Sequence, residues 1–221
     1  MKTFNELQEG VYDPNIFKAI FLAGGPGSGK SYVVRRTTGG LGMKIVNSDD
    51  VYEKMLKDVG LDTTPEDIYS DQGQEIRVRA KKTVKTMQSN YIEGRLGHII
   101  DGTGKDYDKI SKQVSMLKGL GYDCYMIFVN TSLDTAQERN RMRSRTLPEK
   151  QVAQMWNEVQ RNIGKFQSLF GSKDFIIVDN NDAGEDVFAK VWKRISKLVK
   201  SKVTNSIAKR WISQELAKKK R

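Results

Sequence analysis

Short apolar runs alternate with longer amphipathic stretches along most of the chain. Apolar runs without internal alternation are typical of strands that are buried on both faces of a sheet. The five strand-like runs are 18–23, 44–47, 98–101, 125–129 and 175–178. The helix-like stretches start at residue 30, cover 51–59, 65–96, 107–120, 133–145 and 148–170, and resume at 187. This order predicts βαβ units, and so an α/β three-layer sandwich with a mostly parallel sheet of about five strands and ligands at the carboxyl ends of the strands.

The composition excludes several classes of protein and site. The 221 residues include one cysteine, Cys124, and one histidine, His98, so an intrachain disulfide, a Cys-rich zinc site and a multi-His metal centre are all excluded. No apolar run approaches the ~20 residues of a membrane span. The opening MKTFNELQEG lacks the basic and then apolar layout of a signal peptide. We therefore expect a cytoplasmic protein.

Positive charge is concentrated at the carboxyl end of the chain. The formal net charge is +11, and residues 187–221 hold twelve basic residues against Glu215 alone, whereas 1–186 is balanced. This predicts a body over 1–186 followed by a basic helix and tail over 187–221. Such a tail suggests contact with a polyanion such as nucleic acid. A solvated helix face accounts for the same residues equally well.

The segment GGPGSGKS at 24–31 matches the phosphate-binding loop, or Walker A motif, in full. It follows an apolar strand and precedes a helical pattern, which is the context of a P-loop NTPase. Lys30 is expected to reach the β- and γ-phosphates, and the Ser31 hydroxyl to bind Mg²⁺. The cofactors are therefore ATP and Mg²⁺. The predicted nucleotide-binding residues here are Gly25, Pro26, Gly27, Ser28, Gly29, Lys30, Ser31 and Tyr32.

Carboxylates follow the second and third predicted strands. A carboxylate at a strand end beside a P-loop can accept the proton of an attacking hydroxyl, so Asp49 is the predicted general base and substrate-binding residue. Asp50 is then the better candidate for the N-cap of the helix that follows. Asp101 is expected to help bind Mg²⁺ and also the substrate, and the Thr103 hydroxyl to bind the acceptor. A plain strand-to-turn role is the alternative for Asp101 and Gly102.

Four arginines, at 139, 141, 143 and 145, precede Pro148. A mobile arginine segment can close over a transferring phosphoryl group and neutralise its charge. We therefore predict a lid over about 132–148, with Arg139, Arg143 and Arg145 as catalytic residues. A basic surface helix or an RNA-binding patch is the alternative.

The order of these motifs resembles the zeta-toxin and phage polynucleotide-kinase branch of the P-loop kinases, over about residues 16–180. The resemblance implies that Asp49 activates an acceptor hydroxyl and that the lid arginines contact the transferred phosphate. It also places Asn180 where related kinases receive the adenine.

The sequence departs from both branches. Asp101 replaces the longer acid that binds a nucleotide sugar in zeta toxins. Val51 and Tyr52 stand where the phage kinase has a basic residue.

We expect an ATP-dependent kinase that phosphorylates a hydroxyl of a nucleotide, a nucleotide sugar or a nucleic-acid end. The alternative is a nucleic-acid-binding ATPase, or an ATP switch, without a covalent acceptor. Residues 102–105 read Gly-Thr-Gly-Lys, with no Gln or Glu to position water, which favours the kinase. A third option is a toxin-like fold whose tail recruits a partner.

Overall fold

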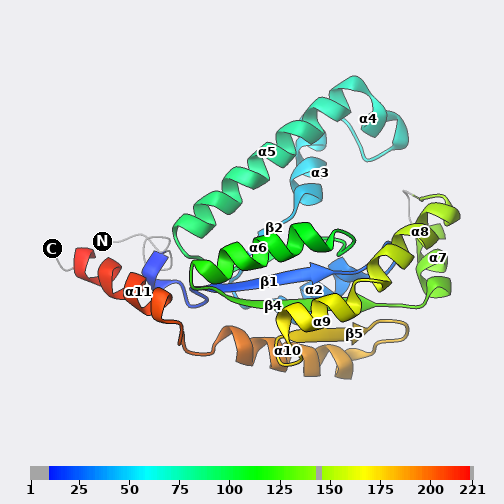
Figure 1. Cartoon of the computed structure of the whole chain (residues 1–221). Coiled ribbons are helices and arrows are strands. Elements are labelled where there is room, and N and C mark those ends of the chain that lie inside the picture. The colour runs from blue at the N-terminus through cyan, green and yellow to red at the C-terminus, as the bar shows by residue number, and fades with distance from the viewer. Residues whose placement is uncertain (1–9, 143–145, 220–221) are drawn as a thin grey trace.

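A single parallel sheet forms the centre of the molecule (Figure 1), seen in a computed structural model that describes residues 10–142 and 146–219. The strand order is β2-β3-β1-β4-β5, and every neighbouring pair is parallel. The strands are β1 (Lys18–Ala23), β2 (Lys44–Val46), β3 (His98–Ile100), β4 (Asp123–Asn130) and β5 (Phe175–Asp179). The predicted α/β fold with about five parallel strands is confirmed.

Helices cover both faces of this sheet. The helical elements are the 3₁₀ turn η1 (Gly10–Tyr12), α2 (Lys30–Thr38), α3 (Ser48–Asp58), α4 (Pro65–Tyr69), α5 (Asp71–Glu93), α6 (Tyr107–Gly119), α7 (Leu133–Arg141), α8 (Glu149–Gln160), α9 (Ile163–Phe170), α10 (Glu185–Val199) and α11 (Ser206–Lys219). Within the described ranges, none of them is long and apolar enough to cross a membrane.

The strand residues divide between two cores because successive side chains point to opposite faces. On one face, Phe21 and Phe128 pack with residues of α6, α8 and α9. On the other, Ile20 and Ile127 pack with residues of α2 and α10. The three layers fix the carboxyl ends of β1, β3 and β4 along one edge, which is where the phosphate-binding loop begins.

Helices α3, α4 and α5 form an arm that rises from the sheet (Figure 1). The arm has its own small core of Tyr52, Leu56, Ile68, Ile76 and Ala80. In Figure 1 the arm and the α7–α8 pair lie on either side of the edge at which the strands end.

Two predicted long helices are each divided in the structure. The 65–96 stretch is α4 and α5, because Ser70 ends one helix and its hydroxyl accepts a hydrogen bond from Gly73 N–H at 3.0 Å. The 148–170 stretch is α8 and α9. The break falls at Asn162, whose side chain donates to the carbonyls of Gly104 and Lys105 at 3.0 and 2.9 Å.

Both carboxyl-terminal helices pack on the body. In α10, Phe188 and Ile195 are buried against the sheet face that α2 also covers. In α11, Ala208 is fully buried and Trp211 packs edge-on against Phe17 with ring centroids 5.5 Å apart. Trp211 therefore docks the helix. The division of the chain at residue 186 stays a prediction.

Candidate active site

The phosphate-binding loop lies between β1 and α2 and is closely packed from behind. Gly27 and Gly29 have φ angles of 73° and 75°, in the left-handed region that favours glycine. A Cβ on Gly27 would lie 2.2 Å from the carbonyl oxygen of Ala136 in α7, and one on Gly29 would lie 2.5 Å from Asn180 Nδ2. The loop can therefore carry no side chain at these positions, and its backbone N–H groups are available to phosphate oxygens.

Lys30, the first residue of α2, reaches the end of β3. Its Nζ lies 3.0 Å from Asp101 Oδ1, and both side chains are largely buried. Asp101 Oδ2 accepts a hydrogen bond of 3.0 Å from Asn47 Nδ2. The structure thus brings together two residues that the sequence predicted on separate elements, and adds Asn47, to which the sequence assigned no role.

Asp49 and Asp50 occupy the first turn of α3. The prediction that Asp50 caps this helix is wrong, because Asn47 is the N-cap and its Oδ1 accepts a hydrogen bond from Asp49 N–H at 2.8 Å. The helix begins two residues earlier than Asp50, so both carboxylates are free of the capping role.

The pKa of Asp50 is raised from its ordinary value. Partial burial is the main cause, and the negative charges of Asp101 and then Asp49 add to it, while Arg35 acts in the opposite direction. The negative charges of Asp49 and Asp101 therefore act on Asp50 at the edge of the sheet. Neighbouring negative charges raise the pKa of a carboxyl group because they disfavour its charged form.

Thr103 lies beside the start of the phosphate-binding loop. Its carbonyl accepts a hydrogen bond from Gly24 N–H at 3.0 Å, which joins the loop after β3 to the loop after β1. The side chain is half-buried. Its predicted contact with the acceptor stays a prediction.

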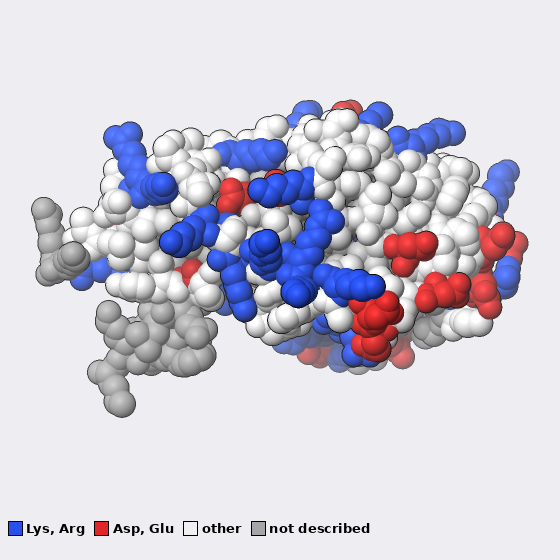
Figure 2. Space-filling view, turned by 90° about the horizontal axis from the view of Figure 1, so that it is seen from below, with Lys and Arg blue, Asp and Glu red and all other residues white. Residues whose placement is uncertain are grey.

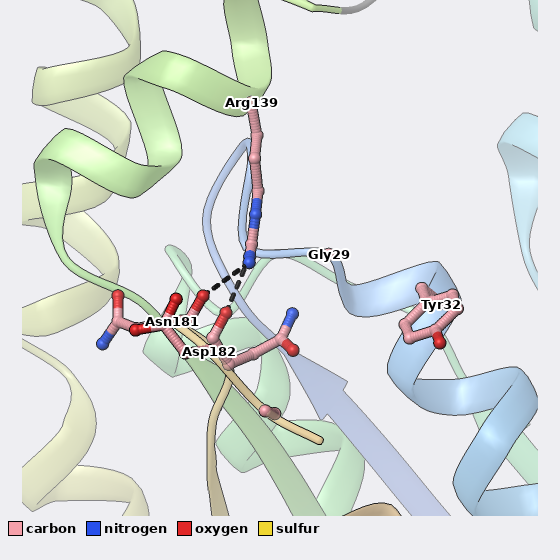
Figure 3. Close-up of a pocket in the computed structure, with 7 residues that line it drawn as sticks. Gly29, Tyr32, Arg139, Asn181 and Asp182 are labelled. Atoms are coloured by element: carbon pink, nitrogen blue, oxygen red, sulfur yellow. Dashed lines mark hydrogen bonds between the residues drawn. The ribbon is translucent and has the colours of Figure 1, made fainter. Parts of the chain in front are cut away.

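Arg139 of α7 is held by the loop that follows β5. Its Nη1 and Nη2 donate to the carbonyls of Asn180 and Asn181 at 2.7 and 2.8 Å (Figure 3). In this position the guanidinium lines a hollow of about 380 Å³ together with Gly29 and the half-exposed Tyr32. The hollow opens at the amino end of α2, beside the phosphate-binding loop. Arg139 therefore fixes one wall of this hollow, and its predicted contact with the transferred phosphate stays a prediction.

Asn180 connects the same hollow to the phosphate-binding loop. The residue is buried, and its Nδ2 donates to the carbonyl of Ser28 at 2.7 Å. The family resemblance implies that Asn180 lies at the adenine. The structure places it in the wall of a pocket of suitable size, with its amide committed to the loop that would hold the phosphates.

Replacing Asn180 by Ala is expected to raise the KM for ATP about tenfold with a smaller change in kcat. The variant removes the bond to Ser28 and leaves that carbonyl without its partner, at a cost of about 1–3 kcal/mol. Steady-state kinetics with varied ATP would measure this. Asn181→Ala is the matched control, because Asn181 lines the same hollow but its Oδ1 accepts from Ser132 N–H at 2.7 Å, and its side chain forms no hydrogen bond with the described phosphate-binding loop. A larger effect in the control would contradict the assignment.

The predicted lid over 132–148 is partly described. Asn140 closes the connection between α7 and α8, since its side chain donates to the carbonyl of Leu147 at 2.8 Å and accepts from Leu147 N–H at 3.0 Å. Arg141 pairs with Glu149 at 2.6 Å. Arg143 and Arg145 lie outside the described residues, so their catalytic roles stay predictions.

One residue beside the site gave no motif signal in the sequence. Trp156 of α8 donates from Nε1 to the carbonyl of Thr131 at 2.9 Å. Its Cα would lie 3.7 Å from a Cβ on Gly25. Trp156 therefore packs against the phosphate-binding loop. This contact forms because the fold places α8 beside the loop, and no local sequence pattern indicates it.

The single histidine and the single cysteine lie away from this edge. His98 is fully buried in β3, where burial lowers its pKa, and its Nδ1 lies 2.9 Å from the carbonyl oxygen of Leu96. Burial raises the pKa of Cys124 to about 12. Both behave as packed core residues.

Comparison with known families agrees with this geometry. The family model described as an AAA domain matches residues 20–161, which is well over half of the chain. The chain belongs to this AAA-domain family. The narrower resemblance to zeta toxins and phage polynucleotide kinases stays a prediction.

Among curated proteins, the chain is 33% identical over 99 residues to a cytidylate kinase from Methanothrix thermoacetophila, covering 43% of this chain. The matched part spans only 58% of the length of that relative.

Among solved structures, a gluconokinase from Sinorhizobium meliloti 1021 superposes with a TM-score of 0.53 at 14% identity, covering 83% of this chain and 94% of that one. A chain of the Pnkp1/Rnl/Hen1 RNA repair complex superposes with a TM-score of 0.51 at 20% identity, covering 68% and 46%. These likenesses concern the fold.

Proposed function

We propose that this P-loop kinase transfers the γ-phosphate of ATP to a hydroxyl group of a nucleotide, a nucleotide sugar or a nucleic-acid end. The observation that carries the proposal is the carboxylate cluster of Asp49, Asp50 and Asp101 beside the phosphate-binding loop. A cluster of negative charge repels an acceptor phosphate, whereas a carboxylate is suited to remove the proton of an attacking hydroxyl.

The phosphates of ATP are placed by the backbone N–H groups of residues 24–31 and by Lys30. Because Lys30 is the only partner of Asp101 Oδ1 within the described ranges, nucleotide binding draws the ammonium between the phosphates and this carboxylate. The nucleoside then lies in the hollow lined by Tyr32, Arg139 and Asn180. Both ends of ATP are thus held by elements that Asn180 connects.

The chemical step is an in-line displacement at the γ-phosphorus. The acceptor oxygen forms a bond to that phosphorus, its proton passes to Asp49, and the bond to the bridging oxygen breaks so that ADP leaves. Asp49 stands in the first turn of α3, which the amide of Asn47 caps. That cap fixes the turn that carries the base.

The residues present fit a magnesium ion. Mg²⁺ in kinase sites is bound by one or two oxygen ligands of the protein with phosphate oxygens and water. Ser31, next to Lys30 in the chain, and Asp101, its ion-pair partner, both supply oxygen ligands, and Lys30 Nζ is the only described group paired with the buried Asp101 Oδ1. When bound, the ion neutralises charge on the transferring phosphoryl group.

The test is transfer from γ-labelled ATP to a parallel panel of acceptors. We expect label in a nucleotide sugar, a nucleoside or a 5′-hydroxyl oligonucleotide. Preferential labelling of a nucleoside monophosphate, the reaction suggested by the Methanothrix relative, would overturn the hydroxyl acceptor. Release of free phosphate with every acceptor unlabelled would overturn the transferase itself in favour of an ATPase.

A further inference from the structure

The outer face of α10 carries a line of lysines. Lys190, Lys193 and Lys197 of α10 and Lys200 at its C-cap are all exposed and follow one another at steps of three, four and three residues. These steps keep successive side chains within about 40° of one direction on a helix, and the line extends over about 15 Å. We call these four residues the lysine stripe. The opposite face of α10 is buried, so this direction faces solvent.

The stripe is little used within the fold. Lys190 pairs with Asp186 at 3.6 Å, and the other three form no hydrogen bond or ion pair with any described residue. The neighbouring Arg194 differs, because its Nη2 donates to the carbonyls of Ser172 and Lys173 at 3.1 and 2.9 Å. Arg194 therefore stabilises the fold, whereas the stripe leaves like charges side by side. That arrangement favours an external anion.

The stripe is separated from the active site. Asp182, Glu185 and Asp186 are exposed where α10 begins, near the carboxyl end of β5. Figure 2 shows this segregation, with basic side chains gathered toward the middle of the face and acidic ones toward the end where the strands terminate. An acceptor strand lying along the stripe would meet this acidic group before the phosphate-binding loop. The stripe is therefore a surface of its own rather than an extension of the acceptor site.

We propose that the lysine stripe binds one strand of a nucleic acid through its phosphates. Four lysines along about 15 Å present a continuous row of positive charge to a nucleic-acid backbone, which carries one negative charge at every phosphate. The stripe holds no apolar anchor at its centre, which a protein interface requires. A single straight line of charge also fits a linear polyanion better than a flat anionic membrane.

The test is fluorescence anisotropy with a labelled single-stranded oligonucleotide that carries phosphates at both ends and so offers no 5′-hydroxyl. We compare Lys193→Gln/Lys197→Gln with Lys209→Gln/Arg210→Gln, which removes the same charge from exposed positions on α11. The stripe variant is expected to bind about tenfold more weakly at low salt. Its slope of log K against log salt should fall by about 1.4, at ~0.7 for each phosphate that is no longer neutralised. The α11 variant should bind within about twofold of the unmodified protein.

Three results would overturn the proposal: no binding by the unmodified protein in ~50 mM salt, equal weakening in the two variants, or binding to phosphatidylserine vesicles without binding to the oligonucleotide. Lys30→Met should retain oligonucleotide binding, because Lys30 belongs to the ATP site. Lys30→Met therefore separates the two proposals, because it is expected to lose phosphotransfer and to keep oligonucleotide binding. Circular dichroism of each variant confirms folding, and glutamine is a good helix former at these exposed positions.

Discussion

Replacing Asp49 by Asn is expected to lower kcat by about 10²–10⁴-fold while ATP binding is retained. General-base catalysis contributes an effect of this size, and the amide keeps the shape of the side chain without accepting a proton. The N-cap hydrogen bond is donated by the backbone N–H of residue 49 to Asn47 Oδ1, so it survives a change of the Asp49 side chain. Single-turnover transfer from γ-labelled ATP measures the rate, and equilibrium binding of an ATP analogue measures the affinity.

Asp50→Asn is the matched control, since it removes the neighbouring carboxylate from the same helical turn. We expect a change in kcat of less than about tenfold. If Asp50→Asn showed the full loss of kcat while Asp49→Asn kept normal turnover, Asp50 rather than Asp49 would be the base. Because burial raises the pKa of Asp50, activity would then fall with decreasing pH at a higher pH than the ordinary ~3.9 of an aspartate.

Replacing Lys30 by Met is expected to lower kcat/KM by at least about 10³-fold. The variant removes a cation that neutralises charge on the phosphates, and one such interaction is typically worth 10²–10³ in kcat alone. It also leaves Asp101 without its ion-pair partner at 3.0 Å, so two negative groups face each other when ATP binds. Steady-state kinetics with varied ATP would show both effects.

Lys112→Met is the control for Lys30→Met, because Lys112 is an exposed lysine of α6. Its kinetics should stay within about twofold of the unmodified protein. If Lys30→Met retained more than a tenth of the original kcat/KM, the arrangement of Lys30 between Asp101 and the phosphates would be contradicted.

The strands and their order along the chain were predictable because they depend on local composition. The run 18–23 matches β1 residue for residue, three others differ from the observed strand by one residue at one end, and β4 extends beyond 125–129 by two residues at its start and one at its end. Buried parallel strands read as continuous apolar runs, so the signal lies within each segment. The phosphate-binding loop was equally clear, since its glycines and Lys30 are contiguous.

The features that the sequence did not reveal depend on side chains that bond to distant backbone. Asn162 interrupts the predicted 148–170 helix by bonding to the loop after β3, and Arg139 is positioned by carbonyls some forty residues away. Neither partner is visible to a periodic pattern. Asn47 was missed as an N-cap for a different reason, since it stands beside Ser48, Asp49 and Asp50, which are all residues that favour caps.

In the carboxyl-terminal region, the sequence located the positive charge but not the residues that packing would leave exposed. Its net charge predicted an exposed basic segment, and the lysines of α10 are exposed. Trp211 stands among these basic residues, and its contact with Phe17 docks α11 on the body. Composition therefore located the charge, while the packing of α10 and α11 decided which of its residues remain available.

The measurement that tests the central claim most directly is the ³¹P NMR spectrum of the purified transfer product. A phosphate on a hydroxyl gives a monoester signal coupled to protons on carbon, without coupling to a second phosphorus. The account predicts this monoester, formed with Asp49 as base. Splitting of the transferred phosphorus itself by a neighbouring phosphorus, beyond the couplings already present in the acceptor, would show an anhydride on an acceptor phosphate, and would contradict the assignment of the carboxylate cluster to a hydroxyl acceptor.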